Sequence, residues 1–230
     1  MKINKSHIVF LLITLLMSTG KIFSQEQRGS DVQPITKLFA KANFRVPFAT
    51  SNPFFRETSK GIVEMSGSLN YSFIKNFYLG AGYKYTYYKL SEIKLNASPN
   101  ELYDAKIQLH GFYGELSYFY PMYDNFLIEG NIQIGRETIK TSSRTCNVNG
   151  ASNSKLGLFV SPNLNFYLLT EEVFSFHFSL GYNFSSNGFN PEDVCETSFS
   201  GYKPNAYLGN YGSLNVGLGI GISFVKPRNL

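Results

Sequence analysis

Residues 213–224 alternate without a break between apolar residues and residues that are small or polar. The apolar positions are Leu214, Val216, Leu218, Ile220, Ile222 and Phe224, and Gly, Ser and Asn stand between them. Successive side chains of a β-strand point to opposite faces, so this strand has one wholly apolar face and one small, uncharged face. The solvent face of a soluble sheet normally carries charged residues. A face of Gly, Ser and Asn instead suits the crowded interior of a narrow barrel whose apolar face is turned to lipid.

The first 24 residues have the pattern of a cleaved export signal. Lys2 and Lys5 precede an apolar run that ends at Met17, and small and polar residues follow, ending in Ile22-Phe23-Ser24-Gln25. A positive start, an apolar stretch of this length and a small residue at the end are typical of secretory signals. The run is too short for a membrane-spanning helix, which needs about 20 apolar residues. We therefore expect residues 1–24 to be removed on export.

The composition favours a membrane barrel over a nucleic-acid-binding or soluble protein. The formal charge of +5 falls to +2 when the three lysines of the signal are removed, so the basic balance is no indication of a nucleic-acid partner. Charged residues make up 16% of the chain, against about 25% in a typical soluble protein. The chain also holds 21 Phe and 16 Tyr. Low charge with many aromatic residues is typical of lipid-facing strands and interfacial girdles.

The same alternation occurs in seven earlier segments, so eight strands are predicted in total. They cover approximately residues 38–48, 61–73, 77–90, 107–120, 126–139, 156–168, 173–184 and 213–224. Pro162 falls inside the sixth strand, where we expect a bulge to accommodate its missing N–H. Gln108 and His110 fall on the nominally lipid-facing side of the fourth strand, and we expect them to lie above the hydrocarbon.

The connections between these strands are alternately short and long. The three short links are residues 74–76, 121–125 and 169–172, and the four long ones are residues 49–60, 91–106, 140–155 and 185–212. With eight antiparallel strands, all the short links and both termini lie at one end, which is the layout of outer-membrane barrels. The predicted fold is therefore an all-β, eight-stranded, antiparallel up-and-down transmembrane β-barrel over residues 38–225. Residues 25–37 would be a short periplasmic segment, and residues 226–230 a C-terminal tail.

Two stretches of the mature chain resemble a known family. The stretches read KANFRVPF from Lys41 and NFYLGAGYKY from Asn76, and they follow an export signal that ends at Ser24-Gln25. In these features the chain is similar to the small outer-membrane β-barrel domain proteins of Bacteroidota, with an architecture like that of OmpA and OmpX. The resemblance covers nearly the whole mature chain and implies an outer-membrane location in a Gram-negative type of envelope. It specifies architecture, and it carries no catalytic signature.

The inward faces of the predicted strands carry charged residues of both signs and one histidine. They are Lys41, Arg45, Lys84, Glu64, Glu115, Glu129 and His177. An eight-stranded barrel is only wide enough for its interior side chains to fill it, and buried charges need partners. We expect Arg45 to meet Glu64 and Lys84 to meet Glu115. A plugged, ion-paired lumen is thus favoured over a gated pore.

The two cysteines lie in the third and fourth long links, which would be outside the cell. Disulfides persist in such a compartment, and an even cysteine count favours pairing. We therefore expect a Cys146–Cys195 disulfide that braces two surface loops. The alternative is a pair of free thiols.

No catalytic, cofactor-binding or metal site is predicted. His177 and Ser179 form a His-x-Ser pair like that of some outer-membrane lipid hydrolases. In those enzymes the pair faces lipid, whereas here Phe176, Phe178 and Leu180 occupy the lipid face and turn the pair inward. The two histidines of the mature chain do not make up a metal-ligand set without carboxylates that the pattern does not supply.

The sequence therefore predicts a non-catalytic outer-membrane barrel with a structural or surface-interaction role. Its expected partners are outer-membrane lipid, lipopolysaccharide and an extracellular or envelope protein whose identity the sequence leaves open. We expect no nucleic acid and a monomeric barrel. One alternative is an outer-membrane acyl hydrolase. The other is a soluble lipocalin-like carrier, in which the faces would be reversed and the apolar residues would surround a ligand.

Overall fold

The computed structural model describes residues 37–90, 105–123, 125–143, 153–170, 173–188 and 209–224. All of them belong to one compact unit, Gln33–Leu230. The predicted signal peptide and C-terminal tail lie outside the described residues.

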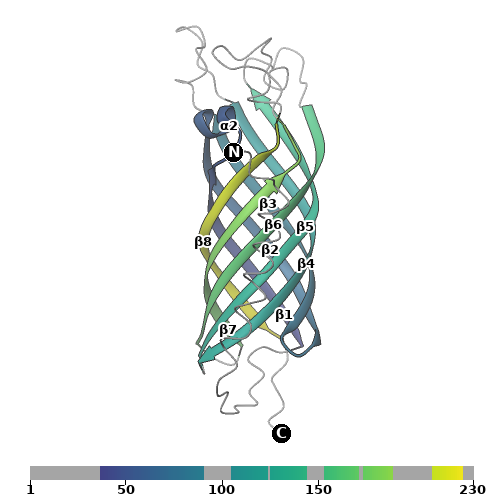
Figure 1. Ribbon diagram of the computed structural model, residues 1–230, viewed down its shortest axis with the longest axis vertical. Coiled ribbons are helices and arrows are strands. Elements are labelled where there is room, and N and C mark those ends of the chain that lie inside the picture. The colour runs from purple at the N-terminus through teal and green to yellow at the C-terminus, as the bar shows by residue number, and fades with distance from the viewer. Residues whose placement is uncertain are drawn as a thin grey trace, which may run out of the picture. The chain divides into compact units, whose positions relative to one another are not determined.

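Eight strands form a closed antiparallel barrel in which each strand pairs with its neighbours in sequence and β1 pairs with β8 (Figure 1). The elements are β1 (Leu38–Ala49), α2 (Pro53–Thr58), β2 (Ser59–Ile74), β3 (Phe77–Leu90), β4 (Ala105–Tyr123), β5 (Phe126–Ser143), β6 (Asn153–Leu169), β7 (Phe174–Ser185) and β8 (Tyr211–Ser223). The predicted fold class is confirmed. Closure leaves no strand edge unpaired, which a barrel in lipid requires because an unsatisfied backbone group there costs several kcal/mol.

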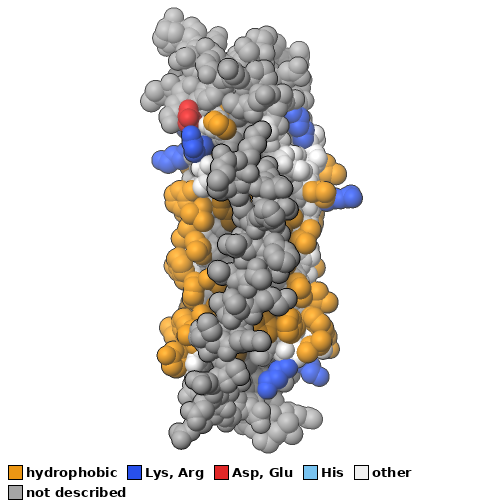
Figure 2. All heavy atoms as spheres, viewed as in Figure 1, with side chains coloured by type: hydrophobic (Ala, Val, Ile, Leu, Met, Phe, Trp, Pro, Cys, Tyr) orange, Lys and Arg blue, Asp and Glu red, His pale blue; other side chains and the backbone are white. Residues whose placement is uncertain are grey.

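The apolar rows form the outer wall of the barrel. Leu218 of β8 is 66% exposed, whereas Asn215, which has the opposite parity on the same strand, is completely buried. On β7, Phe178 faces out and Ser179 is completely buried. Figure 2 shows apolar side chains along both flanks of the visible wall at mid-height. The reversed arrangement that a lipocalin-like carrier would need is therefore wrong for this barrel.

The turn between β2 and β3 has only two residues, and its backbone geometry explains how a link can be this short. Lys75 and Asn76 join β2 to β3, and Asn76 has a φ of 67°. Tight hairpins need positive φ in the turn, and asparagine tolerates it better than most residues. Because the strands run up and down, all the short connections lie at this same end, which we call the short-turn end. The opposite end, which carries the long connections and α2, is the long-loop end.

The bulge expected at Pro162 is wrong. The β6–β7 pairs Val160↔Phe184 and Asn163↔Gly181 keep one register, so no extra residue is inserted between them. The ladder to β7 is interrupted at this point because proline has no N–H to donate. On the other side, Pro162 still pairs with Ile132 of β5.

The register of β2 and β3 shifts at another place, between Gly61 and Val63. Here β2 passes very close to β1, and a Cβ on Gly61 would overlap the carbonyl oxygen of Pro47. Glycine is the residue that allows such a close backbone approach.

The short helix α2 lies at the long-loop end (Figure 1). Asn52 caps it, because its Oδ1 accepts a hydrogen bond from the N–H of Phe55 at 3.1 Å, and Pro53 occupies the first turn. Phe54 and Phe55 are fully buried. Within the described part of the chain, no helix has the length and apolarity needed to cross a membrane.

Candidate functional site

The lumen of the barrel has three layers, and it is the candidate site. An apolar cluster closes the long-loop end, and we call it the upper plug: Phe54, Phe55, Tyr88, Leu90, Ile107, Leu109, Ile139 and Tyr211. A second cluster, the lower plug, closes the short-turn end: Phe39, Tyr78, Phe119, Leu127 and Tyr167. A polar layer of buried charged and amide side chains lies between the two plugs.

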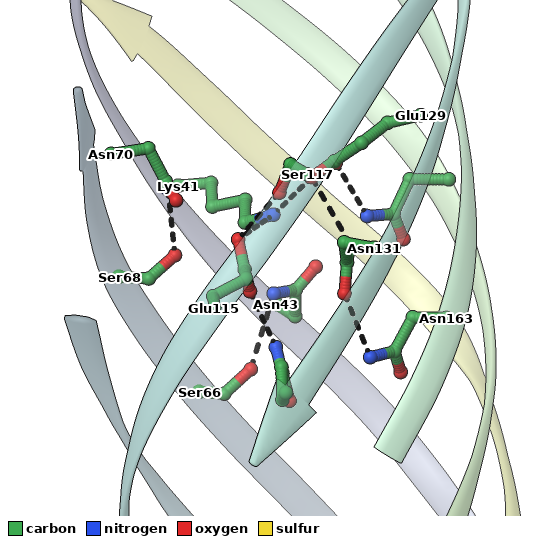
Figure 3. A network of polar contacts seen from close by, with 12 residues as sticks. Lys41, Asn43, Ser66, Ser68, Asn70, Glu115, Ser117, Glu129, Asn131 and Asn163 are labelled. Atoms are coloured by element: carbon green, nitrogen blue, oxygen red, sulfur yellow. Dashed lines mark hydrogen bonds and ion pairs between the residues drawn. The ribbon is translucent and has the colours of Figure 1, made fainter. Parts of the chain in front are cut away.

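Lys41 is the centre of the lower half of the polar layer. Its Nζ lies 2.5 Å from Glu115 Oε1 and 2.5 Å from Glu129 Oε1 (Figure 3). All three side chains are buried, so one ammonium group compensates two carboxylates. Buried carboxylates need further hydrogen-bond donors when a cation is shared in this way.

Amide and hydroxyl groups supply those donors. Glu129 Oε2 accepts hydrogen bonds from Asn165 Nδ2 at 2.7 Å and from the Tyr167 hydroxyl at 2.8 Å. Glu115 accepts hydrogen bonds from Gln133 Nε2 at 2.7 Å and from the Ser117 hydroxyl at 3.0 Å. Tyr167 belongs to the lower plug, so this network ties the polar layer to that plug.

Arg45 and Glu64 form the ion pair that the sequence predicted. Arg45 Nη2 lies 2.5 Å from Glu64 Oε1, and both side chains are buried. Arg45 Nη1 also donates to Asn163 Oδ1 at 2.6 Å, on the far side of the lumen. Asn215 Nδ2 donates to Glu64 Oε2 at 3.1 Å. The pair therefore links four strands of the wall: β1, β2, β6 and β8.

The expected contact of Lys84 with Glu115 is wrong, because Lys84 pairs with Glu137 instead, at 3.5 Å. The register of β3 and β4 places Lys84 opposite Gly111, whereas Glu115 lies opposite Gly80. Four residues along a strand correspond to about 13 Å, which is too far for a salt bridge. Glu137 is the β5 partner of Gly111, so the two charged residues flank a glycine on the same rung.

Gly111 makes room for that contact. A Cβ at Gly111 would lie only 3.2 Å from Cγ of Lys84, so the missing side chain lets the lysine cross over β4. Lys84 Nζ also donates to Asn183 Oδ1 at 2.6 Å and lies 3.4 Å from the ring centroid of Phe159. This cation–π contact adds to the ion pair in a desolvated setting.

Glu137 is a lumenal residue that the sequence analysis missed. It accepts hydrogen bonds from the Ser185 hydroxyl and from the Tyr211 hydroxyl, the latter at 2.8 Å. Tyr211 belongs to the upper plug, so Glu137 ties that plug to the polar layer. Glu137 has the same parity on β5 as Glu129 and Gln133, and this shared parity is the sequence signal for an inward side chain.

His177 lies in the lumen and takes part in packing and hydrogen bonding. Its Nε2 is 2.6 Å from Asn43 Oδ1, and its ring lies 4.4 Å from the ring of Tyr167. Ser179 also faces the lumen and is completely buried. The structure therefore places His177 and Ser179 away from the lipid-facing wall, where an acyl chain would lie.

The other candidates lie elsewhere. Gln108 and His110 face outward on β4, where the Tyr83 hydroxyl and His110 Nδ1 are 2.6 Å apart. Cys146 and Cys195 lie outside the described residues, so their disulfide stays a prediction. In the ranges that the structure describes, no group of three His, Cys, Asp or Glu residues could hold a metal ion.

Comparison with known proteins identifies the fold. No family model and no curated protein matches the chain. Among solved structures, Neisserial surface protein A matches with a TM-score of 0.50 and 13% identity, over 82% of this chain and 98% of that one. OprG of Pseudomonas aeruginosa has a TM-score of 0.45 and 10% identity, over 84% of this chain and 100% of its own.

Ail, the attachment invasion locus protein of Yersinia pestis, has a TM-score of 0.44 and 11% identity, over 80% of this chain and 97% of its own. At these identities the likeness concerns the fold alone. The closed eight-stranded barrel and the likeness to Neisserial surface protein A together show that the chain has the fold of the eight-stranded outer-membrane β-barrels.

Proposed function

We propose that this protein is a non-catalytic outer-membrane protein of a Gram-negative type of envelope. The barrel anchors the chain, and the long connections face the outside and carry a structural or surface-interaction role. The observation that carries the proposal is the arrangement of the two faces. The outer wall is apolar, and the charged residues are buried in a lumen that a plug closes at each end.

The filled lumen argues against two other uses of the barrel. A pore needs a continuous water-filled path, whereas here the polar layer is ion-paired and both ends are closed by aromatic side chains. A carrier needs an empty apolar interior, and the interior of this barrel is filled by charged and amide side chains. Function is therefore assigned to the surface at the long-loop end.

The hydrolase alternative lacks the geometry it requires. A lipid hydrolase would need a histidine and a serine on the lipid-facing wall beside an acid. His177 and Ser179 face the lumen, and His177 is held by Asn43 and Tyr167. His110 does face outward, but its Nδ1 is hydrogen-bonded to a tyrosine and not to a carboxylate.

The long connections at the outer end would form the interaction surface. In this proposal a Cys146–Cys195 disulfide joins the third and fourth of them and restricts their motion. A braced surface loses less conformational entropy on binding, so it presents its side chains more effectively to a partner. The barrel itself would act as a monomer.

Membrane fractionation and surface labelling of intact cells test this proposal. We expect the full-length protein in the outer-membrane fraction and its loops within reach of an external protease. Recovery in the aqueous fraction without detergent would contradict the location. A maleimide reagent tests the disulfide: we expect labelling of Cys146 and Cys195 only after reduction, and labelling before reduction would contradict the brace.

A further inference from the structure

Three lysines stand side by side on the outer wall at the long-loop end. Lys60 of β2 is the cross-strand partner of Lys89 of β3, and Lys89 is in turn the partner of Lys106 of β4. All three side chains are exposed. We call these residues the lysine row. Directly opposite residues have Cβ atoms about 5 Å apart, and like charges at that distance destabilise a sheet.

Within the described residues, no acidic side chain on strands β2–β5 compensates this charge at the long-loop end. Among the ion pairs that join two described residues, only Arg56–Glu57 lies outside the lumen, and none includes a lysine of the row. The outward positions of β2–β5 at this end hold no Asp or Glu. They add two more cations, Lys140 and Arg136 of β5. This part of the wall is therefore purely cationic, and binding of an external anion would relieve the repulsion between its side chains.

From the middle of the barrel toward the row, the outward-facing residues change from apolar to hydrogen-bonding aromatic to cationic, which matches the order from acyl chain to headgroup in a lipid. Phe112 and Ile134 are strongly exposed and belong to the apolar wall. Above them comes a belt of hydrogen-bonding aromatic side chains, in which Gln108 Nε2 donates to the Tyr85 hydroxyl at 3.1 Å. The lysine row follows at the outer end of the same strands. Figure 2 shows Lys and Arg side chains beyond the apolar band toward both ends of the visible wall.

The length of β4 places the row at the level of lipid headgroups. β4 has 19 residues. At about 3.3 Å per residue and a tilt near 40°, such a strand rises roughly 45 Å, whereas the apolar band of an outer-membrane barrel is about 25 Å tall. Because Lys106 is close to the outer end of β4, it stands beyond that band.

We propose that the lysine row binds the phosphate groups of a phosphorylated glycolipid in the outer leaflet. The inference rests on the outer-membrane location proposed above. Lys60 and Lys106 are separated by two strand spacings, about 10 Å, so the row can contact more than one anionic group of a headgroup. A lipid is favoured over a free anion because the apolar wall directly below the row packs against its acyl chains.

Binding to lipid A in detergent micelles tests the proposal. The probes are bisphosphorylated lipid A, its dephosphorylated form and inorganic pyrophosphate, and the readout is a native mass spectrometric titration of the refolded mature protein. The test variant is K89T/K106T, and the matched control is K37T/K75T, which removes two lysines at the short-turn end. We expect the test variant to lose roughly 25-fold in affinity for bisphosphorylated lipid A, since each lysine beside an anionic surface contributes about fivefold.

We expect the K37T/K75T control to bind as the unmodified protein does, K89R/K106R to keep most of the affinity, and added salt to weaken binding. Equal affinity of K89T/K106T and the unmodified protein would overturn the proposal. So would equal binding of dephosphorylated lipid A, and equal affinity for pyrophosphate would overturn the assignment to a lipid. If the protein fractionates with the outer membrane but fails these binding tests, only the proposed lipid binding by the lysine row is contradicted, and the proposed location stands.

A stability measurement separates binding from a structural role. In micelles without lipid A, K89T relieves two repulsions, so its melting temperature should equal or exceed that of the unmodified protein. Adding bisphosphorylated lipid A should then stabilise the unmodified protein more than K89T. A loss of stability in K89T without lipid A would instead assign the row a structural role and overturn the proposal.

Discussion

Lys41 of β1 and Glu129 of β5 come from opposite walls of the barrel, and their side chains meet in the lumen with Nζ 2.5 Å from Oε1. The two residues are 88 positions apart in the chain. Because β1 and β5 never pair directly, this contact acts as a crossbar that depends on closure of the whole barrel.

The substitution Lys41→Met should strongly destabilise the barrel. It leaves Glu115 and Glu129 buried without their shared cation, and removing one partner of a buried ion pair costs about 3–5 kcal/mol. Urea unfolding of the protein refolded in lipid vesicles measures this loss. The triple variant K41M/E115Q/E129Q should recover most of it, because no uncompensated charge remains. A loss below 1 kcal/mol in Lys41→Met would contradict the crossbar.

Phe55→Ala should destabilise the long-loop end. Phe55 is fully buried, and its ring lies 4.8 Å from that of Tyr88 and 4.9 Å from that of Tyr211. Truncating a buried phenylalanine to alanine typically costs about 3–5 kcal/mol. Phe48→Ala is the control, since Phe48 is 52% exposed on the lipid-facing wall and its loss leaves no internal cavity. Equal losses in the two variants would contradict the upper plug.

Removing one plug should not open a pore. The unmodified protein should give no steady conductance in planar bilayers, and F54A/F55A should give none either, because the lower plug and the ion-paired layer remain. Steady nanosiemens currents from the unmodified protein would overturn the plugged lumen. The same currents from F54A/F55A would show that the lower plug does not seal.

Glycine substitutions should distinguish the crowded lumen from the lipid-facing wall. A Cβ on Gly82 would overlap the Gly67 carbonyl oxygen and the Tyr113 ring, so Gly82→Ala should cost about 1–3 kcal/mol of unfolding free energy. Gly130 has no atom within 4 Å of such a Cβ. Gly130→Ala should therefore be nearly neutral in the same urea titration. A comparable loss in both variants would contradict the close packing at Gly82.

The directions of the side chains were accessible from sequence because they depend only on the alternation within each strand. Lys41 and Arg45 share the parity that points both side chains into the lumen, and Leu218 and Phe224 share the parity that points both to lipid. The tight turn at Asn76 was equally local. The lower plug was missed because an aromatic residue at an inward position near a strand end looks, in sequence, like part of the lipid-facing pattern.

The tertiary structure decided the contacts that cross from one strand to another. Lys84 reaches Glu137 and not Glu115 because the register between β3 and β4 puts Gly111 beside it, and register is a property of paired strands. The upper plug likewise depends on α2, whose Phe54 and Phe55 become buried only when the barrel presents a cavity to fill. Alternation along one strand determined which side chains face inward. The closure of the barrel and the register between strands decided which of them meet, because together they set the level along the barrel axis at which residues far apart in the chain lie.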